Sequence, residues 1–328
     1  MSSPHSPIPV GLVGAGKHGG RYLRHIGDDV PELRVALLCR RDTAAGERQA
    51  SACGARFVAD VRELVSSPAI EAVIAVVPPS LNVDICLLAA AAGKAVLVEK
   101  PLAVSVEAGR RIRAAVEGAG VPFMVAQTLR FNHVVACLRD HLATIAPVAQ
   151  VCLSQRFEPS VLEWLDDPAV SGGGIILHTG VHSFDLLRLF APTEPAWALA
   201  ATTRVATRRT EDNFTALFGF RSPGVTATVA GSRSTAGRSG AIEISGERGQ
   251  LVGDHVLGFA VRIEGSRRID LVPSPVAPTV RETLRAFARA LRSGEPMPIR
   301  LDDGLRAVAM AEACYRSAAS GRREPIEI

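Results

Sequence analysis

The sequence has 328 residues, which is enough for two domains of ordinary size, each with its own hydrophobic core. Its residues are 47% hydrophobic and 21% charged, as in folded globular proteins, and the formal net charge is only +4. So small and dispersed an excess of positive charge does not suggest a nucleic-acid-binding surface. The densest basic runs, residues 204–209 and 262–268, contain no interleaved aromatic residues, and we interpret them as solvated strand ends or loops.

The cysteines and the N-terminus indicate the compartment. Six cysteines are spread along the chain without a CxxC pair or a metal-ligand spacing. Most lie in apolar runs, where cysteine behaves as a small hydrophobic residue, and this favours a reducing compartment. Residues 1–9 lack the basic and apolar segments of a signal peptide. No apolar run reaches the roughly 18 residues of a membrane span, so we expect a cytoplasmic protein without a membrane partner.

In the first half of the chain, short apolar runs typical of strands alternate with stretches of helical spacing. The predicted strands are residues 8–13, 33–39, 57–58, 72–77, 95–99 and 123–127. The predicted helices are residues 19–26, 43–52, 61–66, 82–92 and 105–118. Continuous apolar strands separated by helices predict an α/β domain with a parallel sheet that is covered on both faces.

The pattern changes after residue 145, where strand-like runs follow one another with turn signals between them. These runs are residues 148–157, 197–206, 214–220, 225–232, 241–245 and 256–263. They predict a largely antiparallel sheet, after which two helices, 280–292 and 305–317, close the chain. We expect one domain over residues 1–127 and an α/β domain over residues 128–328, whose C-terminal helix is a candidate to pack back on the first domain.

A glycine pattern, G-x-G-x-x-G, lies between the first predicted strand and the first predicted helix. Gly14 permits a tight turn, Gly16 lets the backbone approach a pyrophosphate, and Gly19 lets the helix pack closely on the strand. The alternative is a plain strand–helix turn, but the position at the start of a β/α run favours a doubly wound Rossmann domain that binds a nicotinamide dinucleotide. The residues that we expect to contact the cofactor here are Gly14, Ala15, Gly16, Lys17, His18 and Gly19.

The residues after the second predicted strand bear on the choice of cofactor. A carboxylate at this point accepts hydrogen bonds from the adenosine ribose and repels a 2′-phosphate. This sequence has Arg40 and Arg41, whose guanidinium groups suit a phosphate by charge and by bidentate geometry. In the alternative, both arginines point to solvent and Asp42 reaches the ribose. We predict NADP as the cofactor, with NAD as the other possibility.

Three further segments carry a family resemblance. They read VIAVVPPSLN at residues 73–82, AGKAVLVEKPL at 92–102 and SGGGIILHTGVHSFD at 171–185. With the glycine loop and the closing helix, they resemble the Gfo/Idh/MocA oxidoreductases over nearly the whole chain. The resemblance implies a Rossmann domain followed by an α/β domain with a large open, mainly antiparallel sheet that often mediates oligomerisation, hence a homodimer or homotetramer. It also implies hydride transfer between a nicotinamide cofactor and a hydroxyl or ketone carbon of a sugar, cyclitol or related small molecule.

The resemblance also assigns catalytic roles. Lys100 matches the lysine of the family's Glu-Lys-Pro motif, beside the nicotinamide and the reacting oxygen, where an ammonium group stabilises a developing alkoxide. Without the resemblance it would be an ordinary strand-end lysine. His182 matches the acid/base histidine of the family's D-x-G-x-H element, and His178 stands where that element has aspartate. An imidazole still forms hydrogen bonds, but the charge that would orient the substrate or tune His182 is gone.

Other site residues follow from the same resemblance. Pro78 and Pro79 occupy the family's turn over the nicotinamide, and Asn82 replaces a frequent histidine. The further candidates for cofactor binding are Val77, Pro78, Pro79, Asn82, Glu99, Lys100 and Gln127. The further candidates for substrate binding are Arg130 and Trp164, for which a structural salt bridge and a core position are the respective alternatives.

Two other functions stay open. His178 and His182 are four residues apart, a spacing that metal sites use on helices, but no H-E-x-x-H glutamate and no obvious third ligand accompany them. We therefore predict no metal site. The alternative function, a metal-dependent hydrolase or deaminase, would require stoichiometric metal in the purified protein. The other alternative is a catalytically silent dinucleotide-binding regulator, against which the retention of Lys100 and His182 argues.

Overall fold

The computed structural model describes residues 6–160, 162–221 and 224–328, which form two compact units. Within the described part, the first unit comprises residues 6–103, 107–128 and 278–304. The second comprises residues 104–106, 129–277 and 305–328. The first unit thus takes in a late segment of the chain as well as its beginning.

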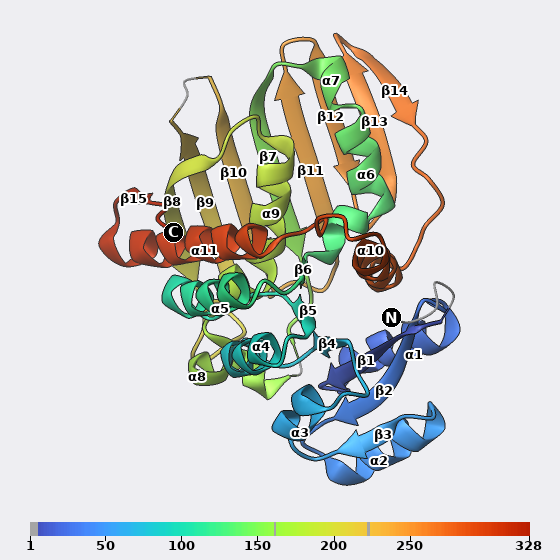
Figure 1. Cartoon of the computed structure of the whole chain (residues 1–328). Coiled ribbons are helices and arrows are strands. Elements are labelled where there is room, and N and C mark those ends of the chain that lie inside the picture. The colour runs from blue at the N-terminus through green and yellow to red at the C-terminus, as the bar shows by residue number, and fades with distance from the viewer. Residues whose placement is uncertain (1–5, 161, 222–223) are drawn as a thin grey trace. The chain divides into compact units, whose positions relative to one another are not determined.

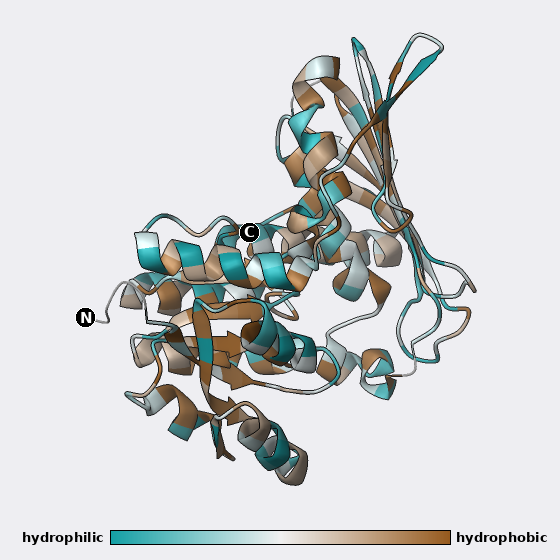
Figure 2. Ribbon diagram, turned by 90° about the vertical axis from the view of Figure 1, so that its right-hand side faces the viewer, coloured by the Kyte–Doolittle hydropathy of each residue, from teal (hydrophilic) through white to brown (hydrophobic). Residues whose placement is uncertain are grey.

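The first unit is built on a six-stranded sheet of the order β3-β2-β1-β4-β5-β6, in which every neighbouring pair is parallel (Figure 1). Its strands are β1 (Ile8–Val13), β2 (Leu33–Cys39), β3 (Arg56–Val58), β4 (Ala72–Ala75), β5 (Ala95–Glu99) and β6 (Phe123–Ala126). They are almost wholly apolar (brown in Figure 2), as strands buried on both faces must be. The predicted doubly wound parallel sheet is confirmed, although β4 ends at Ala75, before Val76 and Val77.

The helices of the first unit follow the strands in the predicted alternation. They are α1 (Gly19–Asp28), α2 (Thr43–Ala52), α3 (Val61–Ser66), α4 (Asn82–Ala91), α5 (Val106–Ala119) and α10 (Thr279–Ser293). The late helix α10 packs against α1 and β6. Its apolar stripe, which includes Leu284 and Phe287, is buried, as expected of an amphipathic helix on a core.

The second unit contains a nine-stranded sheet of the order β14-β13-β12-β11-β7-β10-β9-β8-β15. Its strands are β7 (Val148–Arg156), β8 (Pro195–Thr203), β9 (Asn213–Phe220), β10 (Thr226–Ser232), β11 (Ser239–Gly246), β12 (Gly249–Asp254), β13 (Phe259–Glu264), β14 (Arg267–Leu271) and β15 (Glu324–Pro325). Among the strand pairs that the structure describes in this sheet, only β7 and β10 are parallel, so the predicted, mainly antiparallel sheet is confirmed. The two basic runs lie in the loop after β8 and across the β13–β14 hairpin.

One face of this sheet is covered by helices. The helices of the second unit are α6 (His133–Asp140), α7 (Leu142–Ile145), α8 (Pro168–Ser171), α9 (Val181–Phe190) and most of α11 (Leu301–Ser320). Helices α6, α7 and α9 pack on strands of the sheet, and Figure 1 shows them on the same face. Within the described ranges, no helix combines the length and apolar character needed to cross a membrane.

Candidate functional site

The glycine loop after β1 has the geometry that its sequence predicts. Gly14 has a φ of +87°, and a Cβ there would lie 2.2 Å from the carbonyl oxygen of Val76. A Cβ on Gly19 would lie 1.8 Å from the carbonyl oxygen of Gly14, whereas a Cβ on Gly16 would meet nothing within 4 Å. Packing therefore demands glycine at the first and third positions, while Gly16 leaves open space at the start of α1. This loop fits the pyrophosphate of a dinucleotide, because the first N–H groups of a helix have no partner within the helix.

The predicted cofactor residues gather at one edge of the first unit's sheet. Gly14 follows β1, Arg40 follows β2, Val77 comes shortly after β4, Lys100 follows β5 and Gln127 follows β6. The carboxyl ends of parallel strands share an edge, and open α/β sheets bind their ligands there. Pro79 begins a short 3₁₀ turn at the same edge.

Arg40 is held against the glycine loop. Its Nη1 donates to the carbonyl oxygen of Ala15 at 3.0 Å and to Oε1 of Gln49 at 2.9 Å, while Nε2 of Gln49 donates to the same carbonyl at 3.1 Å. Asp42 caps α2 by accepting from the backbone N–H of Ala45, and Arg41 is exposed. The guanidinium group of Arg40 is therefore fixed by α2 and by the loop itself.

A buried carboxylate stands beside Lys100. Oε1 of Glu99 accepts hydrogen bonds from Nε2 of His18 at 2.7 Å and from the Tyr22 hydroxyl at 2.6 Å, and Oε2 accepts from the backbone N–H of Lys100 at 2.9 Å. Burial on its own raises the pKa of Glu99, but the hydrogen bond and charge of His18, together with Lys100 and Tyr22, outweigh it and hold the pKa below its usual value. Burial, followed by the charge of Glu99, raises the pKa of Tyr22. The first helix is thus tied to the strand end that carries Lys100 by an ionised carboxylate.

Asn82, the first residue of α4, holds the same strand end from another side. Its Nδ2 lies 3.4 Å from the carbonyl oxygen of Glu99, 3.0 Å from that of Pro101 and 3.3 Å from that of Leu102. The side chain is buried. Its amide nitrogen is therefore directed to the backbone around Lys100, a positioning role that the sequence did not suggest.

In the second unit, both predicted histidines lie on one helical segment. His178 belongs to a π-helical turn (Ile176–Gly180), and His182 lies in the first turn of α9, which continues from it. The Trp164 and His178 rings make a T-shaped contact, with centroids 5.5 Å apart. The second unit thus brings these three predicted residues together.

Glu211, which the sequence analysis did not single out, fixes the start of this helical segment. Its carboxylate accepts from the backbone N–H groups of Gly174 at 3.1 Å and Ile176 at 3.0 Å, and from the Tyr315 hydroxyl at 2.8 Å. Burial raises the pKa of Glu211, and these hydrogen bonds offset the effect in part. A Cβ on Gly174 would lie 2.0 Å from the carbonyl oxygen of Glu211, which explains a glycine at that position.

Arg130 forms the structural salt bridge that was the alternative to substrate binding. Its Nε and Nη2 donate to the two carboxylate oxygens of Asp185 at 2.7 and 2.6 Å. Asp185 lies on α9, on the turn after His182, and is buried. The pair therefore holds the helix that carries His182. Among the residues that the structure describes, no three His, Cys, Asp or Glu side chains form a metal-binding group.

Comparison with known proteins identifies the family. Residues 8–127 match the Gfo/Idh/MocA N-terminal domain, described as an oxidoreductase family with an NAD-binding Rossmann fold. Residues 144–328 match the C-terminal α/β domain of the same family. The chain belongs to the Gfo/Idh/MocA oxidoreductases. The predicted family is thereby confirmed: the protein is an oxidoreductase, and its N-terminal domain is the family's NAD-binding domain.

Individual relatives are similar over most of the chain. A 1,5-anhydro-D-fructose reductase from Ensifer adhaerens is 30% identical, over 83% of this chain and 84% of the relative. Inositol 2-dehydrogenase 2 from Saccharopolyspora erythraea is 27% identical, over 97% of this chain and 95% of the relative. A solved levoglucosan dehydrogenase, in complex with NADH and levoglucosan, superposes with a TM-score of 0.89 at 20% identity, covering 98% of this chain and 100% of that one. At that identity the structural likeness shows the fold alone.

Proposed function

We propose that this oxidoreductase transfers a hydride between a nicotinamide cofactor, with NADP favoured, and a hydroxyl or ketone carbon of a sugar, cyclitol or related polyhydroxylated molecule. The observation that carries the proposal is the buried Glu99 network, which fixes Lys100 at the same sheet edge as the glycine loop. The names of the two relatives, a reductase of an anhydro-sugar and a dehydrogenase of inositol, support this substrate class.

The chain's residues have distinct roles in this proposal. The Lys100 ammonium group donates to the reacting oxygen and stabilises the alkoxide that develops on it. In the second unit, His182 has the acid/base role that the family resemblance implies, while His178 and Trp164 contact the substrate. Arg130 acts through Asp185 by holding α9 in place. When bound, the nicotinamide supplies the hydride acceptor or donor.

The preference for NADP rests on Arg40. A guanidinium group that is already ordered by Ala15 and Gln49 loses little conformational entropy when it binds a 2′-phosphate. Arg41, exposed beside it, adds positive charge. Competitive titration of the purified protein with NADPH and NADH tests this part, and tighter binding of NADH would refute it.

We further propose that the nine-stranded sheet joins two copies of this chain. Helix α9 covers the face that carries Phe218, against which its Phe184 ring packs. The opposite face carries Leu199 and Leu217, which are cross-strand partners and are both exposed. A second copy of the same face would bury them. Light scattering should give a dimer or tetramer that Leu217→Lys weakens, and a monomeric wild type would refute this.

The activity itself is tested with a panel of sugars, cyclitols and their ketones, monitored by reduced-nicotinamide absorbance. Turnover of at least one panel member supports the enzyme, and its loss in Lys100→Ala and His182→Ala assigns the residues. Cofactor binding without any redox change across the panel would favour the silent regulator instead.

A further inference from the structure

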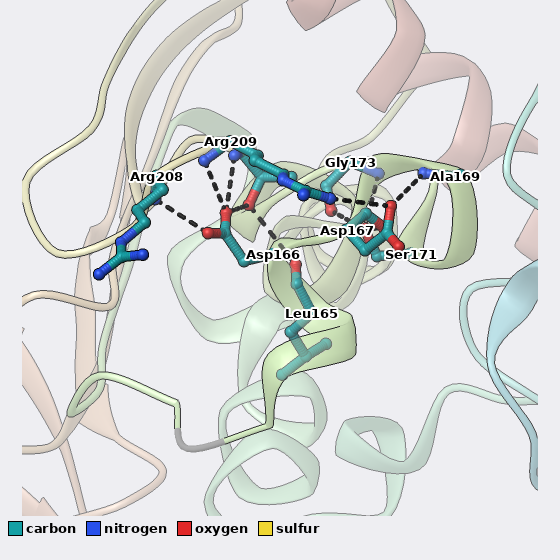
Figure 3. Close-up of polar contacts among 9 residues, drawn as sticks. Leu165, Asp166, Asp167, Ala169, Ser171, Gly173, Arg208 and Arg209 are labelled. Atoms are coloured by element: carbon teal, nitrogen blue, oxygen red, sulfur yellow. Dashed lines mark hydrogen bonds and ion pairs between the residues drawn. The ribbon is translucent and has the colours of Figure 1, made fainter.

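One carboxylate joins two loops of the second unit that are far apart in sequence (Figure 3). Oδ2 of Asp166 accepts from the backbone N–H of Arg208 at 2.9 Å. Oδ1 accepts from the backbone N–H groups of Arg209 at 3.0 Å and Thr210 at 2.8 Å, and from the Thr210 hydroxyl at 3.0 Å. Asp166 ends the 3₁₀ turn Glu163–Asp166, while its partners lie in the loop between β8 and β9.

The loop that Asp166 grips, residues 204–212, is itself well braced. The carboxylate of Asp212 accepts from the backbone N–H groups of Val205, Ala206 and Thr207, at distances between 2.5 and 3.1 Å. At the far end of the loop, Glu211 holds the backbone of the segment that leads to His178. The 204–212 loop is therefore held in one conformation. The His178 segment is hydrogen-bonded to it through Glu211, and the turn Glu163–Asp166 through Asp166.

The Asp166 turn also carries an aromatic side chain of the candidate site. Trp164 lies two residues before Asp166 in the same turn, and its ring makes a T-shaped contact with the ring of His178. The side chain of Trp164 is half-buried, so part of the indole is left for a ligand. A four-residue 3₁₀ turn has few hydrogen bonds of its own, so its contacts with the 204–212 loop help to determine where Trp164 lies.

We propose that Asp166 is a positioning residue, which docks the turn on the 204–212 loop and so fixes Trp164 against His178 as one wall of the substrate pocket. An indole face packs on the C–H groups of a cyclic polyol or sugar, so a fixed Trp164 selects ring-shaped substrates. This inference rests on the proposed function for the substrate. The placement of Trp164 by Asp166 does not depend on the proposed function.

The neighbouring Asp167 offers a matched control. Its Oδ1 caps α8 through the backbone N–H of Ala169 at 3.1 Å, and it lies 3.8 Å from Nη1 of Arg209. Asn is as good a helix N-cap as Asp, and an exposed ion pair contributes little. Asp167→Asn therefore removes the same charge one residue away, but leaves the hydrogen bonds between Asp166 and the 204–212 loop in place.

The placement is tested by fluorescence. The chain has two tryptophans, Trp164 and Trp197, so Trp197→Phe leaves Trp164 as the only reporter. In that background, Asp166→Ala and the nearly isosteric Asp166→Asn should red-shift the emission and raise the acrylamide quenching constant, and Asp167→Asn should not. Unchanged emission and quenching in folded Asp166→Ala, checked by circular dichroism, would overturn the proposal.

The consequence for the substrate is tested by kinetics. Asp166→Asn should raise KM about tenfold, equivalent to ~1.4 kcal/mol, with NADPH affinity unchanged. A merely structural role would lower Tm and the folded fraction but leave KM at the wild-type value, and that result would overturn the pocket assignment. If the proposed function fails instead, the wild type will turn over no member of the panel, while the fluorescence still decides where Asp166 holds Trp164.

Discussion

The Tyr22 hydroxyl donates a 2.6 Å hydrogen bond to the carboxylate of Glu99, which joins the helix after the glycine loop to the residue before Lys100. His18 donates to the same oxygen from the preceding turn. The loop proposed to meet the pyrophosphate and the backbone of Lys100 thus share one buried anion, Glu99. A substitution that breaks this hydrogen-bond network at one end should therefore alter the geometry at the other end.

Tyr22→Phe should lower the free energy of unfolding by about 1–2 kcal/mol, because it removes a donor from a buried carboxylate. It should also weaken cofactor binding, since α1 loses its tie to β5. The only other tyrosine, Tyr315, donates to a different, half-buried glutamate, Glu211, and provides the control. Urea denaturation and NADPH titration of both variants check this: Tyr315→Phe should lose stability but keep cofactor affinity. Equal cofactor affinity in both variants would contradict the network's role.

Alanine substitutions at two glycines of the loop should affect protein stability and cofactor binding separately. Gly19→Ala should destabilise the fold strongly, because its Cβ would overlap the carbonyl oxygen of Gly14. Gly16→Ala should fold normally, because nothing lies within 4 Å of its Cβ, yet bind cofactor at least about tenfold more weakly, since the methyl group enters the space of the pyrophosphate. Thermal melts with and without NADPH measure both effects. Wild-type cofactor affinity in Gly16→Ala would argue against the phosphate cradle.

Arg40→Asp should erode the preference for NADPH over NADH by about tenfold or more, because it replaces a cation beside the 2′-phosphate with an anion. Arg34→Asp makes the same change of charge at an exposed position near the other end of β2, and should leave the preference intact. The ratio of the two dissociation constants is the measurement. Equal erosion in both variants would show that general electrostatics, rather than Arg40, sets the preference.

The carboxyl group of Asp166 should make the free energy of unfolding depend on pH in the acid range. Partial burial would raise its pKa, but the N–H groups of Thr210, Arg208 and Arg209 and the Thr210 hydroxyl outweigh this and lower the pKa to about 2 from the ordinary 3.8. A folded-state pKa below the unfolded value means that the stabilisation is full above pH ~4 and disappears as pH falls through about 2. The difference in unfolding free energy between wild type and Asp166→Asn should follow this course. A difference that persists undiminished at pH 2 would contradict it.

The parallel sheet was predictable because its strands are continuous apolar runs bounded by polar turns. The bounds of β2 and β5 agree with the prediction residue by residue. Helix α9 was missed because seven of its ten residues are buried and none is fully exposed, so no amphipathic period marks it. In the second sheet, β12 was missed because glycines and an aspartate interrupt its apolar pattern, and β14 because it is a charged edge strand.

The site was predictable only where a motif marks it. The glycine loop, Lys100 and the two histidines stand in recognisable patterns, and the structure groups the loop with Lys100 and the histidines with each other. Asp166 and Glu211 belong to no motif, because most of their partners are backbone groups of loops about 40 residues away, and only the folded chain brings them together. Arg130 was ambiguous in the sequence because its partner, Asp185, lies 55 residues further on.

The catalytic roles proposed for Lys100 and His182 are tested most directly by measuring turnover and NADPH affinity together, in the wild type, Lys100→Ala and His182→Ala, with a substrate found in the panel. The proposed function predicts that both variants lose turnover by a factor of about 100 or more, in line with the loss of a general acid–base or electrostatic group, while the dissociation constant of NADPH stays within about twofold. Unchanged turnover in both variants would contradict it.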